Sequence, residues 1–143
     1  MAELSSETLH ATCVAIDGRA VLLTGPSGSG KSDLALRLID RGAILVSDDY
    51  TILRRQGSTL IASAPSTISG KIEMRGVGIV SIASAATAPV HLIVTLDEPV
   101  ARMPEPATRT ISGIALRTLA LSAFEASTPI KIEHALRMDL PAI

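Results

Sequence analysis

The residues of this chain best suited to chemistry form a short glycine-rich segment. Residues 25–32 have the sequence GPSGSGKS, which fits the pattern G-x-x-x-x-G-K-[ST] of a phosphate-binding loop. In such a loop the glycines let backbone N–H groups turn toward a polyphosphate, the lysine adds a positive charge, and the last hydroxyl binds Mg²⁺. The residues predicted to bind a nucleotide are Gly25, Pro26, Ser27, Gly28, Ser29, Gly30, Lys31 and Ser32.

Two pairs of acidic residues could complete such a site. Phosphoryl transfer needs acidic side chains that hold the metal and, where a hydroxyl attacks, a base that accepts its proton. Asp48-Asp49 follow the aliphatic run 44–47, whereas Asp97-Glu98 follow the run 92–96. The second pair is similar to the strand-then-acid element of many P-loop ATPases. The pattern of the sequence alone leaves both choices open.

The elements around the glycine-rich loop indicate an α/β fold. Residues 9–16 and 19–24 are predicted strands, and Asp17-Gly18 between them is typical of a tight hairpin turn. Because a hairpin, and not a helical crossover, leads into the loop, we expect a P-loop domain with a mixed sheet. A helix is predicted after the loop, from residue 33 to residue 41, with Gly42 ending it.

The remaining elements follow from hydrophobic periodicity and turn residues. We expect strands at 43–47, 50–55, 58–63 and 91–96, extended segments at 72–82 and 109–115, and loops at 64–71 and 99–106. Helices are predicted at 116–126 and at 128–138, the second with Thr128 as its N-cap and Pro129 after it. The first of these helices would have an apolar face for the core or for a partner, made of Leu116, Leu119, Ala120 and Ala123.

Composition limits the class of protein and its partners. The 143 residues are 47% hydrophobic, which predicts one folded domain over residues 1–143. The formal net charge is −1, with 13 basic and 14 acidic residues, so neither nucleic acid nor an anionic membrane is an expected partner. Cys13 is the only cysteine, which excludes a disulfide framework and predicts a small buried side chain in a strand.

Aromatic residues are nearly absent, which bears on how a nucleotide base is recognised. The chain has one tyrosine, Tyr50, one phenylalanine, Phe124, and no tryptophan. Aromatic side chains are the usual stacking partners of bases. We therefore expect the phosphates to carry most of the affinity and ATP and GTP to bind comparably.

The first residues indicate a cytoplasmic location. Residues 1–7 have neither the basic start nor the apolar stretch of a secretory signal. No apolar run approaches the ~18 residues that a membrane-spanning helix needs.

Four features in order resemble the catalytic domain of the bacterial HPr kinase/phosphorylase family, in its short alphaproteobacterial form. These features are His10, fifteen residues before Gly25; the glycine-rich loop; the acidic pair Asp48-Asp49, seventeen and eighteen residues after Lys31; and residues 73–79. The last segment, EMRGVGI, is similar to the family signature E-I-R-G-x-G-I. The resemblance extends from His10 to about residue 120.

The resemblance implies a phosphoenolpyruvate-carboxykinase-like fold, ATP and Mg²⁺ as cofactors, and a role for each acidic residue. Asp48 would be the general base for a serine hydroxyl, and the acid in the reverse reaction, in which inorganic phosphate attacks. Ser32 would bind the metal, with Asp49 and Glu73 serving it directly, through water or at a second metal position.

The other catalytic residues that the resemblance implies are His10, Lys31 and Arg75. His10 would lie close to Asp48 and tune it. Lys31 and Arg75 would stabilise charge on the transferred phosphoryl group.

The C-terminal part departs from the family pattern. Residues 112–120 stand where the family has a signature similar to P-V-x-x-G-R-N, and they keep only its arginine, as Arg117. In the family this region helps to separate kinase from phosphorylase activity and contacts a neighbouring subunit. Arg117 is therefore a candidate for a subunit or substrate loop, and the departure weakens the expectation of phosphorylase activity. The family resemblance implies a homo-oligomer, the family's hexamer. From the resemblance we also expect a short form without the N-terminal domain of the long forms.

The function expected from these features is that of a protein serine kinase acting on an HPr-type phosphocarrier, with phosphorolysis as the reverse activity. One alternative is a P-loop NTPase or kinase for another substrate that uses Asp97-Glu98. A second alternative is a nucleotide-sensing module without transfer. Loss of transfer in Asp48→Asn but not in Asp97→Asn would exclude the first alternative, and any phosphorylated product would exclude the second.

Overall fold

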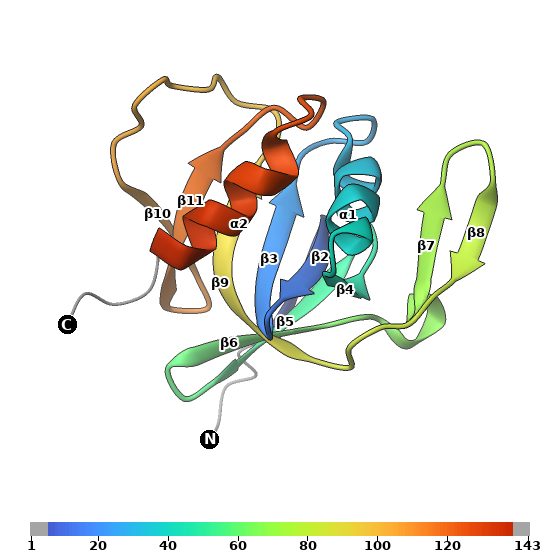
Figure 1. The fold of residues 1–143 in the computed structure, drawn as a ribbon. Helices are drawn as coiled ribbons and strands as arrows, with labels where there is room; N and C mark the ends of the chain where they lie inside the picture. Colours follow the sequence, from blue (N-terminus) through green and yellow to red (C-terminus); the bar gives the residue numbers. More distant parts are fainter. Residues whose placement is uncertain (1–5, 139–143) are drawn as a thin grey trace.

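The strand that leads into the glycine-rich loop lies in the middle of a nine-stranded mixed sheet (Figure 1). The computed structural model of the chain describes residues 6–138. In chain order its elements are β1 (Ser6–Leu9), β2 (Ala11–Ile16), β3 (Arg19–Thr24), α1 (Lys31–Asp40), β4 (Ile44–Ser47), β5 (Thr51–Gln56), β6 (Thr59–Ser63), the 3₁₀ turn η1 (Ser66–Ile68), β7 (Lys71–Met74), β8 (Gly78–Ser81), β9 (Ala88–Thr95), β10 (Ala107–Ile111), β11 (Ile114–Ala120) and α2 (Thr128–Met138).

The sheet combines parallel and antiparallel pairs, as the first hairpin predicted. Its order is β1-β5-β6-β9-β3-β2-β4, with β11 beside β9 and β10 beside β11. Strand β9 runs parallel to both β3 and β11, while β2 pairs antiparallel with β3. The turn at Asp17 and Gly18 has positive φ at both residues, 52° and 78°, which is the geometry of a tight type I′ hairpin. The mixed α/β fold is therefore confirmed.

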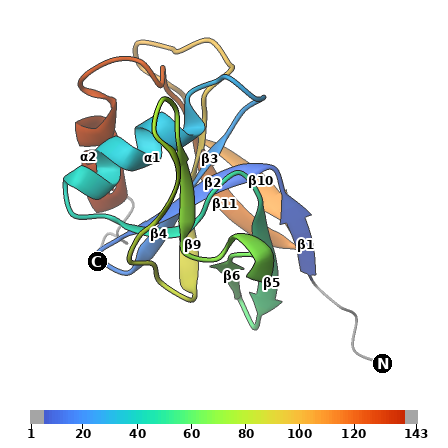
Figure 2. The ribbon, with the colours of Figure 1, turned by 90° about the vertical axis from the view of Figure 1, so that its right-hand side faces the viewer.

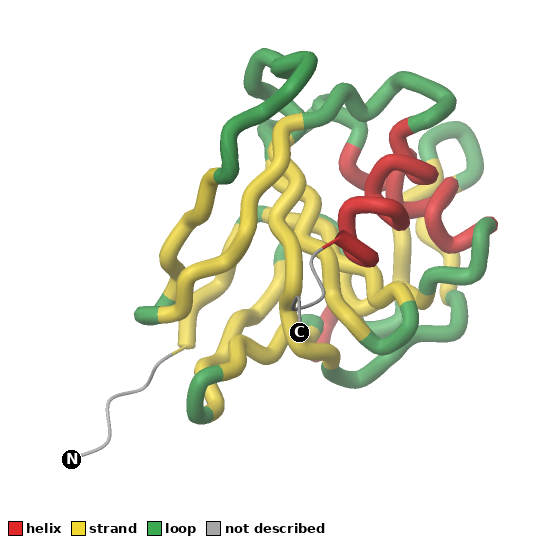
Figure 3. Tube along the Cα trace, turned by 60° about the vertical axis from the view of Figure 1, so that its left-hand side comes forward, coloured by secondary structure: helices red, strands yellow, loops and turns green. Residues whose placement is uncertain are grey.

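Both faces of the central strands are buried, in two separate hydrophobic clusters. Helices α1 and α2 lie on the same face of the sheet (Figure 3), where Val21 and Leu23 pack with Leu34 and Leu136. On the opposite face Leu22 packs among residues of β5, β6 and β11. This alternation is the period of two expected for a strand. Cys13 is fully buried on the second face, as predicted, and burial raises the pKa of its thiol.

The prediction of a helix at 116–126 is wrong. Residues 114–120 form strand β11, which pairs antiparallel with β10 and parallel with β9. Ser112 and Gly113, both with positive φ, make a second tight turn that the sequence analysis did not recognise. Leucine and alanine favour a helix locally, but the partner strands on both sides override that preference. Leu116 and Leu119 consequently pack in the two different clusters, on opposite faces of the sheet.

Two predicted segments are divided in the structure. The segment 9–16 contains the last residue of β1 and all of β2, and His10 lies at the bend between these strands. Residues 72–82 form most of a hairpin of β7 and β8, which lies alongside α1 (olive green in Figure 2). The last helix, from Thr128 to Met138, is confirmed. Among the described residues, no helix has the length and apolar character that crossing a membrane requires.

Candidate functional site

The glycine-rich loop connects the end of β3 to the first residue of α1. Gly30 caps the helix in a left-handed conformation, with a φ of 96°. A Cβ at Gly30 would lie 2.8 Å from the Cβ of Ala123 and 3.0 Å from the ring of Phe124, so only glycine fits there. The positive end of α1 therefore begins within the loop, which is the arrangement that binds a phosphate.

Lys31 and Ser29 show how the loop is prepared for an anion. The Lys31 side chain is buried, and its Nζ donates hydrogen bonds to the carbonyls of Gly25 (2.7 Å) and Pro26 (3.1 Å). An ammonium has three donors, so one remains for a phosphate oxygen. The buried Oγ of Ser29 has no hydrogen-bond partner among the described residues. Such an orphaned hydroxyl fits a loop that binds a polar group or water.

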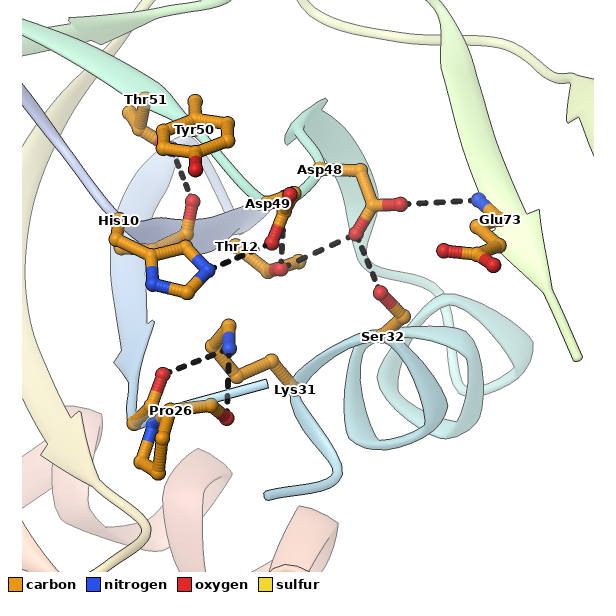
Figure 4. A network of polar contacts seen from close by, with 12 residues as sticks. His10, Thr12, Pro26, Lys31, Ser32, Asp48, Asp49, Tyr50, Thr51 and Glu73 are labelled. Carbon is orange, nitrogen blue, oxygen red and sulfur yellow. Dashed lines mark hydrogen bonds and ion pairs between the residues drawn. The ribbon is translucent and has the colours of Figure 1, made fainter. Parts of the chain in front are cut away.

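Asp48 is the centre of the polar network beside the loop (Figure 4). Asp48 is buried, with 7% of the residue exposed. Its Oδ1 accepts hydrogen bonds from the Oγ of Ser32 (2.6 Å) and the Oγ1 of Thr12 (3.1 Å). Its Oδ2 accepts the backbone N–H of Glu73 at 2.9 Å. Donors from α1, β2 and β7 thus fix one carboxylate at the first turn of the helix that follows the loop.

Asp49 belongs to a second arm of the same network. It has a positive φ of 69°, and its Oδ1 lies 2.8 Å from the Nε2 of His10. The His10 ring stacks on Tyr50, with ring centroids 5.0 Å apart. The backbone N–H of Asp49 donates to the Oγ1 of Thr12, which therefore links the two neighbouring aspartates. The carboxylate that His10 contacts is thus that of Asp49, the residue next to Asp48.

A cavity beside the glycine-rich loop is lined in part by the predicted residues Glu73 and Arg75. The cavity has a volume of about 650 Å³. Its lining residues are Ser27, Gly28, Gly30, Lys31, Ser32, Asp33, Leu36, Asp49, Glu73, Met74, Arg75, Val77 and Phe124. Glu73 is on β7 and Arg75 is in the exposed turn before β8. The cavity therefore has the phosphate loop as its floor and the β7–β8 hairpin as one wall.

The oxygen donors in this cavity fit Mg²⁺ bound together with a substrate. Within residues 6–138 no group of three histidine, cysteine, aspartate or glutamate side chains is arranged to hold a metal. Magnesium in nucleotide sites takes one or two carboxylates and completes its shell with phosphate oxygens and water. Ser32, Asp49 and Glu73 line one cavity and supply a hydroxyl and two carboxylates. This small set fits the ion.

The alternative acidic pair lies elsewhere. Asp97 and Glu98 are exposed in the bend after β9, and neither lines the cavity. Arg117 is also outside the cavity: its Nη1 donates to the carbonyl of Ala135 (2.9 Å) and ties β11 to α2. Asp48 and His10 do not line the cavity themselves, but they contact Ser32 and Asp49, which do. The structure therefore brings them together with the loop, Glu73 and Arg75, and it leaves Arg117 apart.

Thr12 is the residue of the site that the sequence analysis missed. It is fully buried and contacts both aspartates. In the sequence it is one polar residue in the aliphatic strand β2, with no motif around it. Only the pairing of β2 with β4, which carries the acidic pair at its end, could have indicated its role.

Comparison with known proteins identifies the family. The family model of the HPr serine kinase C-terminal domain matches residues 2–97. An HPr kinase/phosphorylase of Clostridium botulinum is 44% identical over 81 residues, which are 56% of this chain and 27% of that protein. One of Clostridium tetani is 45% identical over 83 residues, 57% of this chain and 27% of the relative. The chain thus spans about a quarter of the length of these curated relatives.

A solved structure extends the likeness beyond the residues that the family model matches. The HPr(Ser) kinase/phosphatase of Coxiella burnetii is 33% identical, with a TM-score of 0.80 and coverage of 93% of each chain. The match over residues 2–97 includes His10, the glycine-rich loop, Asp48-Asp49 and Glu73. The chain belongs to the HPr serine kinase C-terminal domain family.

Proposed function

We propose that this chain is a cytoplasmic, ATP- and Mg²⁺-dependent protein serine kinase that acts on an HPr-type phosphocarrier. The observation that carries the proposal is the position of Asp48, a buried carboxylate held 2.6 Å from the hydroxyl of Ser32, at the end of the phosphate loop. A base for an attacking hydroxyl must lie beside the phosphoryl group that is transferred. The similar proteins are named HPr kinase/phosphorylase, which supports HPr as the acceptor and phosphorolysis as a second activity.

In the proposed reaction the loop holds the triphosphate and Asp48 accepts a proton. Backbone N–H groups of the loop and the third donor of Lys31 bind the outer phosphates. The serine oxygen of the acceptor forms a bond to the γ-phosphorus, the bond to the ADP oxygen breaks, and the serine proton passes to Asp48. Arg75, in the turn at the cavity edge, stabilises the charge on the phosphoryl oxygens.

The metal site and the neighbours of Asp48 complete the proposal. Ser32, Asp49 and Glu73 would hold Mg²⁺, which neutralises charge on the phosphates. His10 orients Asp49 through its 2.8 Å contact. Three donors hold Asp48, so its carboxylate cannot turn away from the loop. In phosphorolysis, an oxygen of inorganic phosphate forms a bond to the phosphorus of phosphoserine and the bond to the serine oxygen breaks. Pyrophosphate leaves, and Asp48 gives a proton to the serine oxygen.

The test is phosphate transfer to the HPr-like protein of the same organism. Purified chain, ATP, Mg²⁺ and the acceptor are incubated, and mass spectrometry measures a phosphate-sized gain on a serine. We expect Asp48→Asn to lower the transfer rate by about a hundredfold or more, because a general base contributes ~10²–10⁴-fold. Asp97→Asn, an exposed acid outside the cavity, is the matched control and keeps the wild-type rate.

Each alternative has its own result. Loss of transfer in Asp97→Asn instead of Asp48→Asn would refute the assignment of the base. ATP binding without any phosphorylated product would favour a sensor that lacks catalysis.

A further inference from the structure

Phe124 is an exposed aromatic residue beside the phosphate loop. Its side chain is 71% exposed, although the chain contains only one phenylalanine and one tyrosine. It lies in the connection from β11 to α2, which reaches the same end of the sheet as the loop between β3 and α1 (Figure 1). The ring lines the cavity together with Ser27, Gly28 and Gly30 of that loop.

The ring is in direct contact with the loop. A Cβ built on Gly30 would be 3.0 Å from Cε1 and 3.1 Å from Cζ of Phe124. The ring edge therefore packs against the backbone at the N-cap of α1, while most of Phe124 stays exposed. An exposed apolar ring at this place is unfavourable in water unless something else covers it.

The backbone on both sides of Phe124 is held in place. The guanidinium of Arg37, on α1, donates to the carbonyl of Ala123 and to the carbonyl of Glu125 (3.1 Å). Thr128 donates its hydroxyl to the carbonyl of Ser122. The backbone that carries the ring is thus held by hydrogen bonds, two of them from α1. A side chain on such an ordered segment loses little conformational entropy when a ligand covers it.

We propose that Phe124 is the stacking platform for the base of the bound nucleotide. The proposal rests on the proposed function, because it assumes that the loop holds the phosphates of a nucleoside triphosphate. When the phosphates lie on the loop, the base must lie beside the loop. Phe124 is the aromatic residue among those that line the cavity there. A phenyl face has no hydrogen-bonding group, so it accepts adenine and guanine alike. It supplies affinity without selecting the base.

The test compares a nucleotide with a ligand that has phosphates but no base. Calorimetry in the presence of Mg²⁺ measures the dissociation constants of ATP, GTP and inorganic tripolyphosphate for the full chain. We expect Phe124→Ala and Phe124→Leu to weaken ATP and GTP about five- to a hundredfold, which is the range for losing one base–aromatic contact. Tripolyphosphate should bind the variants as it binds the wild type.

A matched control and a spectroscopic readout separate stacking from other effects. Met103→Ala removes another exposed apolar side chain, one that does not line the cavity, and should change none of the three constants. Phe124→Trp introduces the only tryptophan of the chain. Its fluorescence should change with ATP and stay constant with tripolyphosphate.

The remaining outcomes would overturn the proposal in distinguishable ways. Unchanged ATP affinity in Phe124→Ala would refute stacking. Equal weakening of ATP and tripolyphosphate would show that Phe124 only shapes the loop. A changed molecular mass in solution with unchanged ATP affinity would make Phe124 an interface residue. Wild-type protein that binds neither ATP nor tripolyphosphate would refute the proposed function itself.

Discussion

Replacing Thr12 by valine tests whether one buried hydroxyl organises the acidic pair. Valine has nearly the shape of threonine, so the change removes the hydroxyl and leaves the packing. In the wild type that hydroxyl donates to Asp48 (3.1 Å) and accepts the N–H of Asp49 (3.0 Å), and Thr12 is 0% exposed. Because the position is buried, water cannot take the place of the lost hydroxyl and bond to Asp48 and Asp49 unless the structure opens.

The expected cost follows from the two hydrogen bonds. A hydrogen bond to a charged group contributes about 1.5–3 kcal/mol, and a buried donor left unsatisfied costs about 1–3 kcal/mol. Because the two terms share one hydroxyl they do not add fully. We expect Thr12→Val to lower the free energy of unfolding by about 2–4 kcal/mol.

Urea denaturation, followed by circular dichroism, measures this loss. Thr12→Ser keeps the hydroxyl and should recover most of the stability. Thr59→Val, at an exposed position of β6, is the matched control and should change the free energy of unfolding by less than about 0.5 kcal/mol. If Thr12→Val were as stable as Thr59→Val, the idea that this hydroxyl holds the acidic pair would be refuted. Phosphate transfer by the refolded variant should also be slower, because Asp48 loses one of its three donors.

Three further changes test other parts of the structure. Gly30→Ala should lower the free energy of unfolding by about 2–4 kcal/mol, because Gly30 has a left-handed φ and its Cβ would lie 2.8 Å from a neighbour. Gly57→Ala is the control: Gly57 also has a left-handed φ but its Cβ would meet nothing within 4 Å, so the loss in the same urea assay should be only about 1–2 kcal/mol. The hydrogen bond from Arg41 holds the pKa of Glu133 below its ordinary value in the folded protein. The unfolded chain therefore binds this proton more readily. The free energy of unfolding should fall as the pH drops from the ordinary glutamate pKa through the lowered one. Glu133→Gln should flatten this part of the stability curve in acid titrations, and a curve parallel to wild type would contradict the role of the pair. A fragment of residues 1–87, which lacks β9, should bind no ATP in equilibrium dialysis, while the full chain does; retention of affinity by the fragment would show that β9 is not needed to form the loop.

The sequence was sufficient where a local pattern sets the structure. The turn at Asp17-Gly18 and the glycine-rich loop each need particular residues at particular positions, so their geometry could be predicted. From the hairpin followed the mixed sheet, which the structure confirms. The acidic pair Asp48-Asp49 could be assigned only through the family resemblance, because two strand ends carry acids in this chain.

Features that depend on distant pairing could not be predicted in the same way. The segment 116–120 has helix-favouring residues, but its neighbours β9 and β10 make it a strand. Thr12 meets the acidic pair because β2 lies beside β4. Phe124 meets Gly30 because the last strand, β11, returns the chain to the loop. Strand β10 is the neighbour of β11 in the sequence, but β9, Asp48 and Gly30 lie far from the residues that they contact, and local periodicity carries no information about such distant partners.

The position of β9 in the sheet has a consequence for how the chain folds during its synthesis. Strand β3 pairs with β9, so Ala20 lies opposite Val90, a residue synthesised seventy positions later. The hairpin of β2 and β3 can close early, since its two strands are adjacent, but long-range pairing pays its loop-closure entropy before it gains contacts. A nascent chain therefore carries the complete phosphate-binding motif on the ribosome long before it has the sheet that shapes it. We therefore expect the motif to gain its affinity for phosphate only late in folding, after β9 and then the segment that bears Phe124 have been synthesised.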